Sequence, residues 1–267
     1  MTVTILKNIK EYTAAMKEEL KNEIADMDKA PSLAIIQVGN VEASNRYIRN
    51  KIKDCLEVGI NAHHYVYDEA ITTDELAIEV KDLAEHYNGI IVQLPLPVRI
   101  DVAAINDAIP RDKDVDGFTA NSLFNPATPS GIVDYLEYCG FPFAGAEVLV
   151  IGRSDIVGKP VARMLTTKDC TVTLAHSKSK HMWTHIQDAD LIITAVGRAG
   201  FLNCYSIHDK PVVDVGINFN EEGKMVGDCF NTENRNVTPV PGGVGLLTRC
   251  ALLKNVIAAA RLQDRRI

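Results

Sequence analysis

Short apolar runs with the length of β-strands alternate with segments of helical period along almost the whole chain. Leu33–Gln37 (LAIIQ) and Gly89–Gln93 (GIIVQ) have the composition of buried strands, and Glu42–Val58 between them has the period of an amphipathic helix. The sequence Thr72-Thr73-Asp74-Glu75 is a capping box, in which a threonine oxygen and a carboxylate satisfy the first amides of a helix. Alternation of this kind predicts parallel sheets with helices on both faces.

The segment 112–126 interrupts this alternation, because Asp112–Gly117 is polar and Phe118–Pro126 has no clear period, and a second series of strands follows it. Thr128 is predicted to be an N-cap and Pro129 the N1 residue, and they precede a predicted helical segment over Ser130–Tyr138. A chain of 267 residues can hold two ordinary domains, so we place a boundary between residues 126 and 127. The later predicted elements are strands at Glu147–Ile151, Cys170–Ala175, Asp190–Val196 and Pro211–Val215, and an amphipathic helix over Leu246–Leu262.

Charge and cysteine usage exclude several classes of protein. The 28 Lys and Arg residues against 35 Asp and Glu residues give a net charge of −7, which disfavours a nucleic-acid partner. No apolar stretch reaches the length of a membrane span, and the first residues lack the apolar core of a signal peptide. The six cysteines are scattered without a CxxC motif, which excludes zinc ribbons and thioredoxin-type chemistry. We therefore expect a cytoplasmic enzyme without a membrane partner.

A glycine-rich turn follows the predicted strand EVLVI. Gly152 and Gly158 frame the sequence GRSDIVG, and bare amides at a helix start suit a pyrophosphate. Arg153 adds a guanidinium that can bind phosphate. Because the sequence GRSDIVG differs from the GxGxxG motif, an ordinary strand-to-helix connection is the alternative.

The residues after the next strand favour NADP over NAD. NAD-specific folds place an acid there to hold the ribose, whereas this chain has His176-Ser177-Lys178. Ser177 and Lys178 can donate to a 2′-phosphate, although Lys178 is equally well explained as a solvated surface charge.

In the first half, Tyr47 and Lys51 lie four residues apart on one predicted helix face. An aromatic ring beside an amine can sandwich a flat substrate, and desolvation lowers the pKa of a lysine so that it can act as a base. A half-buried tyrosine beside a lysine that reaches solvent is the alternative. Gln93 is the last residue of a predicted strand, and ligands of parallel sheets bind at this end of the strands. The alternative is that its amide only satisfies the backbone of the following loop.

Two further segments are candidates for ligand binding. Asp116 lies in DKDVDG, which lacks the remaining ligands of a calcium loop, so we expect one buried carboxylate with two solvated neighbours. The segment TPVPGGVG (238–245) is rigid and then free of side chains, which lets a ligand approach the backbone. A stiff connector before the last helix is the alternative.

Together these motifs resemble the bifunctional methylenetetrahydrofolate dehydrogenase/cyclohydrolase family, from about Pro31 to the last helix. The resemblance implies two α/β domains with a cleft between them. A catalytic, folate-binding domain would span 1–126 and be joined by the helix 246–267, and a Rossmann-type NADP-binding domain with a mostly parallel sheet would span 127–245. The motifs that carry the resemblance are PSLAIIQVGN, YIRNK, VQLPLP, DKDVDGF, ATPSG, GRSDIVGKP, AHSKS, DVGIN and TPVPGGVG.

The resemblance implies an activity as well. The family oxidises 5,10-methylenetetrahydrofolate with NADP and hydrolyses the methenyl product to 10-formyltetrahydrofolate, in one-carbon metabolism and purine biosynthesis, and it forms homodimers. Lys51 matches the catalytic lysine, Tyr47 the stacking tyrosine, Gln93 the glutamine that positions lysine and substrate, and Asp116 the carboxylate that binds the pterin. The implied cofactor residues are Gly152, Arg153, Ser154, Gly158, Ser177 and Ile217, and the implied folate-lining residues are Pro241, Gly242, Gly243, Val244 and Gly245.

The chain departs from the family pattern beside the expected folate site. The segment between Asp116 and Thr128 is short, Ala127 replaces a cysteine, and Leu246 replaces a proline. A dehydrogenase with little or no cyclohydrolase activity is therefore the alternative function. A shikimate-type dehydrogenase and a non-catalytic folate-binding protein are further alternatives.

Overall fold

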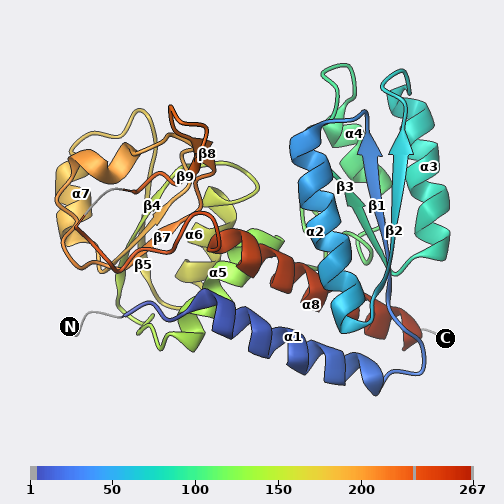
Figure 1. The fold of residues 1–267 in the computed structure, drawn as a ribbon, viewed down its shortest axis with the longest axis horizontal. Coiled ribbons are helices and arrows are strands. Elements are labelled where there is room, and N and C mark those ends of the chain that lie inside the picture. The colour runs from blue at the N-terminus through green and yellow to red at the C-terminus, as the bar shows by residue number, and fades with distance from the viewer. Residues whose placement is uncertain (1–4, 231–232, 266–267) are drawn as a thin grey trace. The chain divides into compact units, whose positions relative to one another are not determined.

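The computed structural model describes residues 5–230 and 233–265, which form two compact units (Figure 1). The three-stranded unit contains Ala15–Ala127 and the chain from Arg249 onward. The four-stranded unit contains the chain up to Ala14 and Thr128–Thr248. The boundaries fall inside α1 (Ile9–Ala25) and α8 (Val244–Asp264), so each of these helices contributes to both units.

The three-stranded unit is built around a parallel sheet in the order β2-β1-β3. The strands are β1 (Ser32–Val38), β2 (Asn61–Tyr67) and β3 (Gly89–Val92), and the helices are α2 (Glu42–Val58), α3 (Thr73–His86) and α4 (Val102–Ala108). In Figure 1, α2 and α3 lie on opposite sides of this sheet. The predicted α/β class with parallel sheets is confirmed.

Alternate residues of β1 face two separate hydrophobic clusters. Leu33 and Ile35 pack into a cluster that includes residues of α2 and α8, whereas Ala34 and Ile36 pack into a cluster with residues of α3 and α4. This is the period of two expected for a strand that is buried on both faces. Residues Leu33–Ile36 of the central strand are therefore all apolar, which is why this part of the sequence has the pattern of a continuous apolar run.

The ends of the helices follow local sequence signals. The predicted capping box forms: the Glu75 N–H donates to Thr72 Oγ1 at 3.3 Å, and the Thr72 N–H donates to Glu75 Oε2 at 2.9 Å. Helix α2 ends at Gly59, whose φ of +98° is a left-handed conformation that favours glycine, and its N–H bonds to the last carbonyls of the helix.

The four-stranded unit has a parallel sheet in the order β5-β4-β6-β7. The strands are β4 (Glu147–Ile151), β5 (Thr171–Ala175), β6 (Leu191–Thr194) and β7 (Val212–Asp214), followed by an antiparallel pair, β8 (Asn218–Phe219) and β9 (Met225–Val226). The helices are α5 (Ala127–Tyr138), α6 (Gly158–Thr166) and α7 (Met182–Asp188), with a 3-10 turn over Phe201–Cys204. The strand order reverses beside β4, and ligands of open α/β sheets bind at such a point.

Helix α5 begins one residue before its predicted cap. It starts at Ala127, so Thr128 is a helical residue and the prediction that it serves as N-cap is wrong. The Thr128 hydroxyl instead bonds to the Thr248 hydroxyl of α8 at 2.9 Å. A Cβ on Gly131 would lie 2.6 Å from the Leu247 carbonyl oxygen, so α5 packs closely against the start of α8. The Thr128 hydroxyl therefore serves a tertiary contact with α8.

None of the helices in residues 5–230 and 233–265 combines the length and the apolar character that crossing a bilayer requires. All six cysteines belong to the described residues, and none of them forms a disulfide.

Candidate active site

Three side chains of the three-stranded unit meet around the amine of Lys51. Lys51 Nζ donates to Gln93 Oε1 at 3.3 Å and lies 3.7 Å from Asp116 Oδ2. The same nitrogen lies 5.0 Å from the centre of the Tyr47 ring, within the range of a cation–π contact. Lys51 is only 4% exposed. The structure thus brings together the four residues that the sequence analysis singled out in the first half of the chain.

The helix α2 and the end of β3 position three of these side chains. Tyr47 and Lys51 project from the same face of α2, one turn apart. The Gln93 N–H continues the pairing of β3 by donating to the Ile36 carbonyl at 2.8 Å. Gln93 Nε2 donates to the Leu94 carbonyl at 2.7 Å, so the other end of the amide, its oxygen, faces Lys51. Gln93 therefore does serve the loop backbone, and its oxygen is still available to the lysine.

Asp116 lies in a turn that is shaped by a second buried carboxylate. Asp114 accepts hydrogen bonds from the Gly117 N–H at 3.0 Å and the Thr119 N–H at 2.8 Å. Asp114 is 1% exposed, so the expectation of one buried carboxylate with two solvated neighbours is wrong. Backbone N–H groups of the turn replace water around Asp114 and make its burial tolerable.

Burial also sets the electrostatics of the site. Desolvation raises the pKa of Asp116 above the ordinary value of an aspartate, against the opposing effect of the Lys51 ammonium, and Asp114 adds to the rise. Desolvation likewise raises the pKa of Tyr47, which keeps its phenol protonated. A buried amine, a carboxylate and an aromatic ring suit a flat ligand that carries N–H donors and undergoes proton transfer.

An ion cluster beside these residues escaped the sequence analysis. Asp54, one turn after Lys51 on α2, binds Lys17 Nζ through Oδ1 at 2.6 Å and Arg249 Nη1 through Oδ2 at 3.0 Å. It joins α2 to the parts of α1 and α8 that belong to this unit. The spacing of Asp54 from Lys51 is visible in the sequence, but its partners come from distant segments that no local pattern connects.

The predicted glycine turn lies between β4 and α6 in the four-stranded unit. Gly152 has a φ of +117°, and a Cβ there would lie 2.3 Å from the Ala195 carbonyl oxygen. A Cβ on Gly158 would lie 2.0 Å from the Gly152 carbonyl oxygen. Both positions therefore require glycine. The Ser154 hydroxyl accepts from the Val157 N–H at 3.2 Å and the Gly158 N–H at 3.4 Å, which holds the turn before α6, while Arg153 is exposed.

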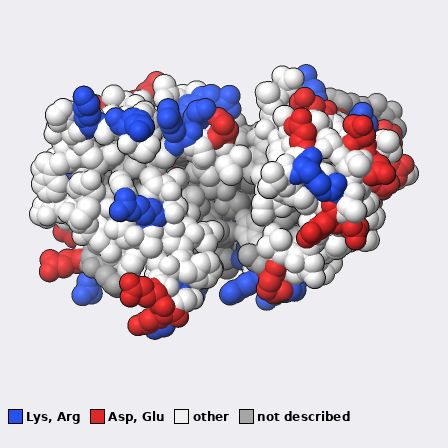
Figure 2. All heavy atoms as spheres, turned by 90° about the horizontal axis from the view of Figure 1, so that it is seen from above, with Lys and Arg blue, Asp and Glu red and all other residues white. Residues whose placement is uncertain are grey.

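The turn after β5 carries no carboxylate over residues 176–180. The Ser179 hydroxyl accepts from the His176 N–H at 2.9 Å, and the Lys178 N–H donates to His176 Nδ1 at 3.2 Å. These bonds fix the turn and leave Ser177 and Lys178 exposed. Figure 2 shows Lys and Arg side chains gathered on part of the surface of this unit, although the chain as a whole is acidic. Ile217, in the loop after β7, is 62% exposed.

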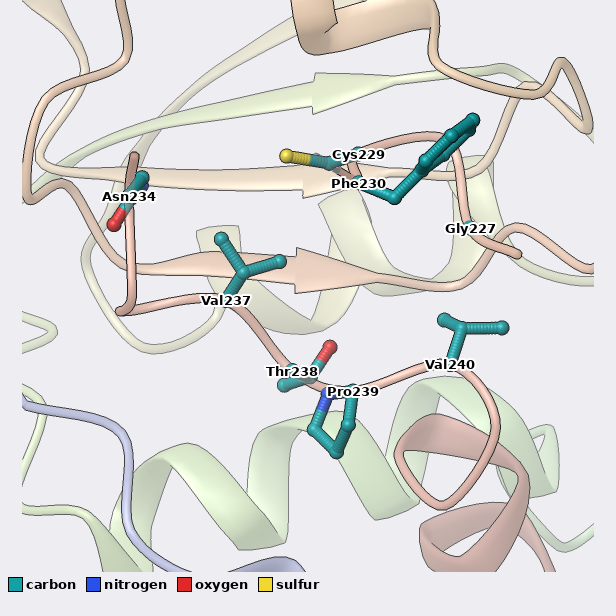
Figure 3. A pocket seen from close by; sticks show the side chains of 8 residues that line it. All are labelled: Gly227, Cys229, Phe230, Asn234, Val237, Thr238, Pro239 and Val240. Carbon is teal, nitrogen blue, oxygen red and sulfur yellow. The ribbon is translucent and has the colours of Figure 1, made fainter. Parts of the chain in front are cut away.

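The segment 241–245 also belongs to the four-stranded unit. Gly242 has a φ of +94°, and a Cβ on Gly243 would lie 2.2 Å from the Pro239 carbonyl oxygen, so neither position accepts a side chain without rearrangement. A cavity of about 270 Å³ lies beside the preceding residues (Figure 3). The residues that line it are Gly227, Cys229, Phe230, Asn234, Val237, Thr238, Pro239 and Val240.

Two family models match the chain in succession. Residues 8–116 match the tetrahydrofolate dehydrogenase/cyclohydrolase catalytic domain, and residues 126–264 match the NAD(P)-binding domain of the same enzymes. Among curated proteins, the bifunctional protein FolD of Brevibacillus brevis is 42% identical over 99% of this chain and 100% of its own length.

Solved structures agree with these matches. The bifunctional FolD enzyme of Campylobacter jejuni superposes with a TM-score of 0.90 at 37% identity, over 96% of this chain and 98% of its own. The FolD enzyme of Trypanosoma brucei, solved with NADP and an inhibitor, has a TM-score of 0.88 at 29% identity, over 99% and 100%.

Proposed function

This chain belongs to the tetrahydrofolate dehydrogenase/cyclohydrolase family, and we propose that it oxidises its folate with NADP and hydrolyses the product at the site around Lys51. It is a bifunctional methylenetetrahydrofolate dehydrogenase and methenyltetrahydrofolate cyclohydrolase of one-carbon metabolism. Because the chain belongs to this family, the alternative of a shikimate-type dehydrogenase is wrong. The convergence of Tyr47, Lys51, Gln93 and Asp116 is the observation that supports this assignment of the site.

Hydrolysis of the methenyl cation requires a base and an acid at one place. Water adds to the bridging carbon and loses a proton, which leaves a hydroxyl on that carbon. The bond from the carbon to N5 then breaks as N5 gains a proton, and the hydroxyl releases its own proton to form the formyl group, so that one proton leaves overall. The Lys51 side chain is placed for both transfers, because an amine can take the first proton and return one to N5. Gln93 holds the amine in place through the 3.3 Å hydrogen bond to its side-chain oxygen.

Asp116 and Tyr47 suit the binding of the pterin ring. The buried carboxylate of Asp116 has little water to stabilise its charge, so the amino group and ring N–H of a pterin are favourable donors to it. The Tyr47 ring offers a flat surface next to the amine. Together these contacts would fix which face of the folate is presented for oxidation.

The dehydrogenase step needs alignment more than acid–base chemistry. A bound nicotinamide dinucleotide would supply the acceptor for the hydride of the methylene carbon. The turn framed by Gly152 and Gly158 fits the pyrophosphate, because its close backbone packing excludes side chains at the start of α6. We assign Ser154 to holding that turn through the hydrogen bonds of its hydroxyl, and Ile217 to contact with the dinucleotide. Residues 241–245 would line the folate, as the family resemblance implies, with Pro241 and Gly245 exposed and Gly243 and Val244 buried.

The choice of NADP rests on the turn after β5. Ser177 and Lys178 are exposed there, and no carboxylate opposes a 2′-phosphate. Arg153 adds a second exposed cation at the neighbouring glycine turn. The NADP bound in the Trypanosoma brucei relative is consistent with this choice.

Assembly and cellular setting complete the proposal. We expect a homodimer, as the sequence resemblance implies, and light scattering on the purified protein tests this. None of the six cysteines, all of which the structure describes, forms a disulfide, and this is consistent with a reducing cytoplasm.

One spectrophotometric assay tests the function. Methylenetetrahydrofolate is supplied with NADP or NAD, and reduced dinucleotide and methenyl absorbance are followed together. We expect reduction of NADP in preference to NAD, with methenyltetrahydrofolate decaying faster than in buffer. Accumulation of methenyltetrahydrofolate without accelerated decay would instead support the dehydrogenase-only alternative. Folate binding without turnover would support a non-catalytic binding protein.

A further inference from the structure

Asp228 is a fully buried carboxylate that the reactions described above do not use. It follows β9 and is 0% exposed. Its Oδ2 accepts hydrogen bonds from the Thr194 hydroxyl at 3.0 Å and the Val196 N–H at 2.9 Å. Its Oδ1 accepts from the Arg198 N–H at 2.8 Å and from Asn218 Nδ2 at 3.0 Å. One side chain thus binds the end of β6, the loop after it and the start of β8.

A second carboxylate holds Asp228 in place. Asp214 accepts from the backbone N–H of Asp228 at 3.1 Å and from that of Cys229 at 2.8 Å. A Cβ on Gly227 would lie 1.9 Å from Asp214 Oδ2, and a Cβ on Gly216 would lie 2.3 Å from Asp228 Oδ1. The backbone therefore approaches both carboxylates at positions where only glycine fits. This close packing leaves Asp228 a single arrangement.

The location of this network indicates its role. Thr194 is the last residue of β6 and Asp214 the last of β7, so the network lies at the carboxyl ends of two adjacent parallel strands. The order β5-β4-β6-β7 puts the glycine turn after β4 next to β6. A dinucleotide with its pyrophosphate on that turn extends its adenosine toward β5 and its nicotinamide toward β6 and β7.

We propose that Asp228 is a positioning residue for the dehydrogenase reaction, which holds residues 196–198 and Ile217 in the shape that receives the nicotinamide half of the dinucleotide. The proposal rests on the proposed NADP function. Asp228 acts through its partners, since its carboxylate is buried beneath them: Ile217 immediately precedes Asn218, which donates to Asp228. The cyclohydrolase reaction uses no dinucleotide, so it provides an internal reference within the same molecule.

Asp228→Asn tests this role. The amide keeps the size of the side chain but turns an NH2 group toward N–H donors. We expect KM for NADP to rise, and kcat/KM of the dehydrogenase to fall, by about tenfold, which corresponds to the loss of one charge-assisted hydrogen bond. Cyclohydrolase turnover, measured without dinucleotide, stays within about twofold of the native value.

Two further variants complete the test. Asp190→Asn is the matched control, because Asp190 accepts from the Glu147 N–H at 2.9 Å at the opposite, amino end of the same sheet. It should leave KM for NADP unchanged. Asn218→Ala removes a single donor to Asp228, and it should raise KM for NADP by about threefold without changing the cyclohydrolase.

Either of two results would overturn the proposal: native NADP binding in Asp228→Asn, or equal proportional losses of both activities, as a purely structural role predicts. If Asp228→Asn does not fold, an unchanged KM for NADP in Asn218→Ala overturns it. Calorimetric titration with NADP compares the variants without turnover. If the native protein binds NADP but has no dehydrogenase activity, the proposed function is contradicted. The effect of Asp228→Asn on NADP binding can still be measured in that case.

Discussion

The two candidate sites of this enzyme are built in opposite ways. Around Lys51, side chains from α2, the end of β3 and a turn converge, and each is partly or fully buried. After β4, the decisive feature is the backbone, because Gly152 and Gly158 pack so closely that any side chain would collide with a carbonyl oxygen. Proton transfer requires particular functional groups, whereas binding of a phosphate chain requires accessible amides. The two sites should therefore respond differently to substitution.

Among these variants, Lys51→Ala should cause the largest loss of activity, and the loss should come from the missing side chain rather than from a change in the backbone. We expect cyclohydrolase turnover to fall by at least about 100-fold, the contribution of a positioned acid–base group. Folate binding, measured by titration, should remain detectable because Tyr47 and Asp116 are unchanged. The matched control is Lys53→Ala, two residues along α2 and exposed. Unchanged hydrolysis in Lys51→Ala would remove this lysine from the mechanism.

Gly152→Ala tests the backbone site in the same manner. Its Cβ would lie 2.3 Å from the Ala195 carbonyl oxygen, so the turn must shift. We expect dehydrogenase kcat/KM for NADP to fall by about 100-fold, as for other misplacements of about 1 Å, with the cyclohydrolase retained.

Gly145→Ala is the control for Gly152→Ala. Gly145 also has a positive φ, of +76°, but no atom lies within 4 Å of its Cβ position. Equal losses of dehydrogenase activity in the two variants would show that backbone strain, rather than the collision at the turn, is responsible.

Arg153→Ala should sharpen the comparison by separating the two dinucleotides. Loss of a guanidinium contact to the 2′-phosphate should weaken NADP binding by about tenfold and leave NAD binding nearly unchanged. Arg163→Ala, at an exposed position on α6, is the control. Calorimetry with both dinucleotides measures the effect, and an equal loss for NADP and NAD would contradict a 2′-phosphate contact.

The smallest expected effect concerns pH and Asp116. Because burial raises the pKa of Asp116, its carboxylate takes up a proton at a pH where an ordinary aspartate is still ionised. The protonated acid accepts fewer hydrogen bonds from a pterin, so folate affinity should decrease severalfold as the pH falls through that raised pKa. Titrations of native protein and Asp116→Asn across the acidic range measure this. If folate affinity in Asp116→Asn depends on pH as strongly as in the native protein, another group is responsible for the pH dependence.

Local sequence patterns predicted the elements but not all of their contacts. The buried strands β1 and β3, the capping box at Thr72 and the pairing of Tyr47 with Lys51 on one helix face are encoded within a few neighbouring residues. The start of α5 was predicted incorrectly, because Thr128 bonds to Thr248 instead of capping its own helix. The solvation of Asp114 was also predicted incorrectly, because its partners are turn amides that a sequence does not display.

The amino-acid sequence by itself determined the parallel α/β architecture, since strand and helix periods follow from which residues alternate toward a core. It also identified the residue types of both sites. No local pattern places Gln93 and Asp116 beside the amine of Lys51, an arrangement that only the family resemblance implied, and none places Asp228 at the loops after β6 and β7; both arrangements arise from how the chain packs. The physical reason is range: helix and strand preferences act between near neighbours, whereas a buried polar group is satisfied by whichever donors the packed chain brings to it.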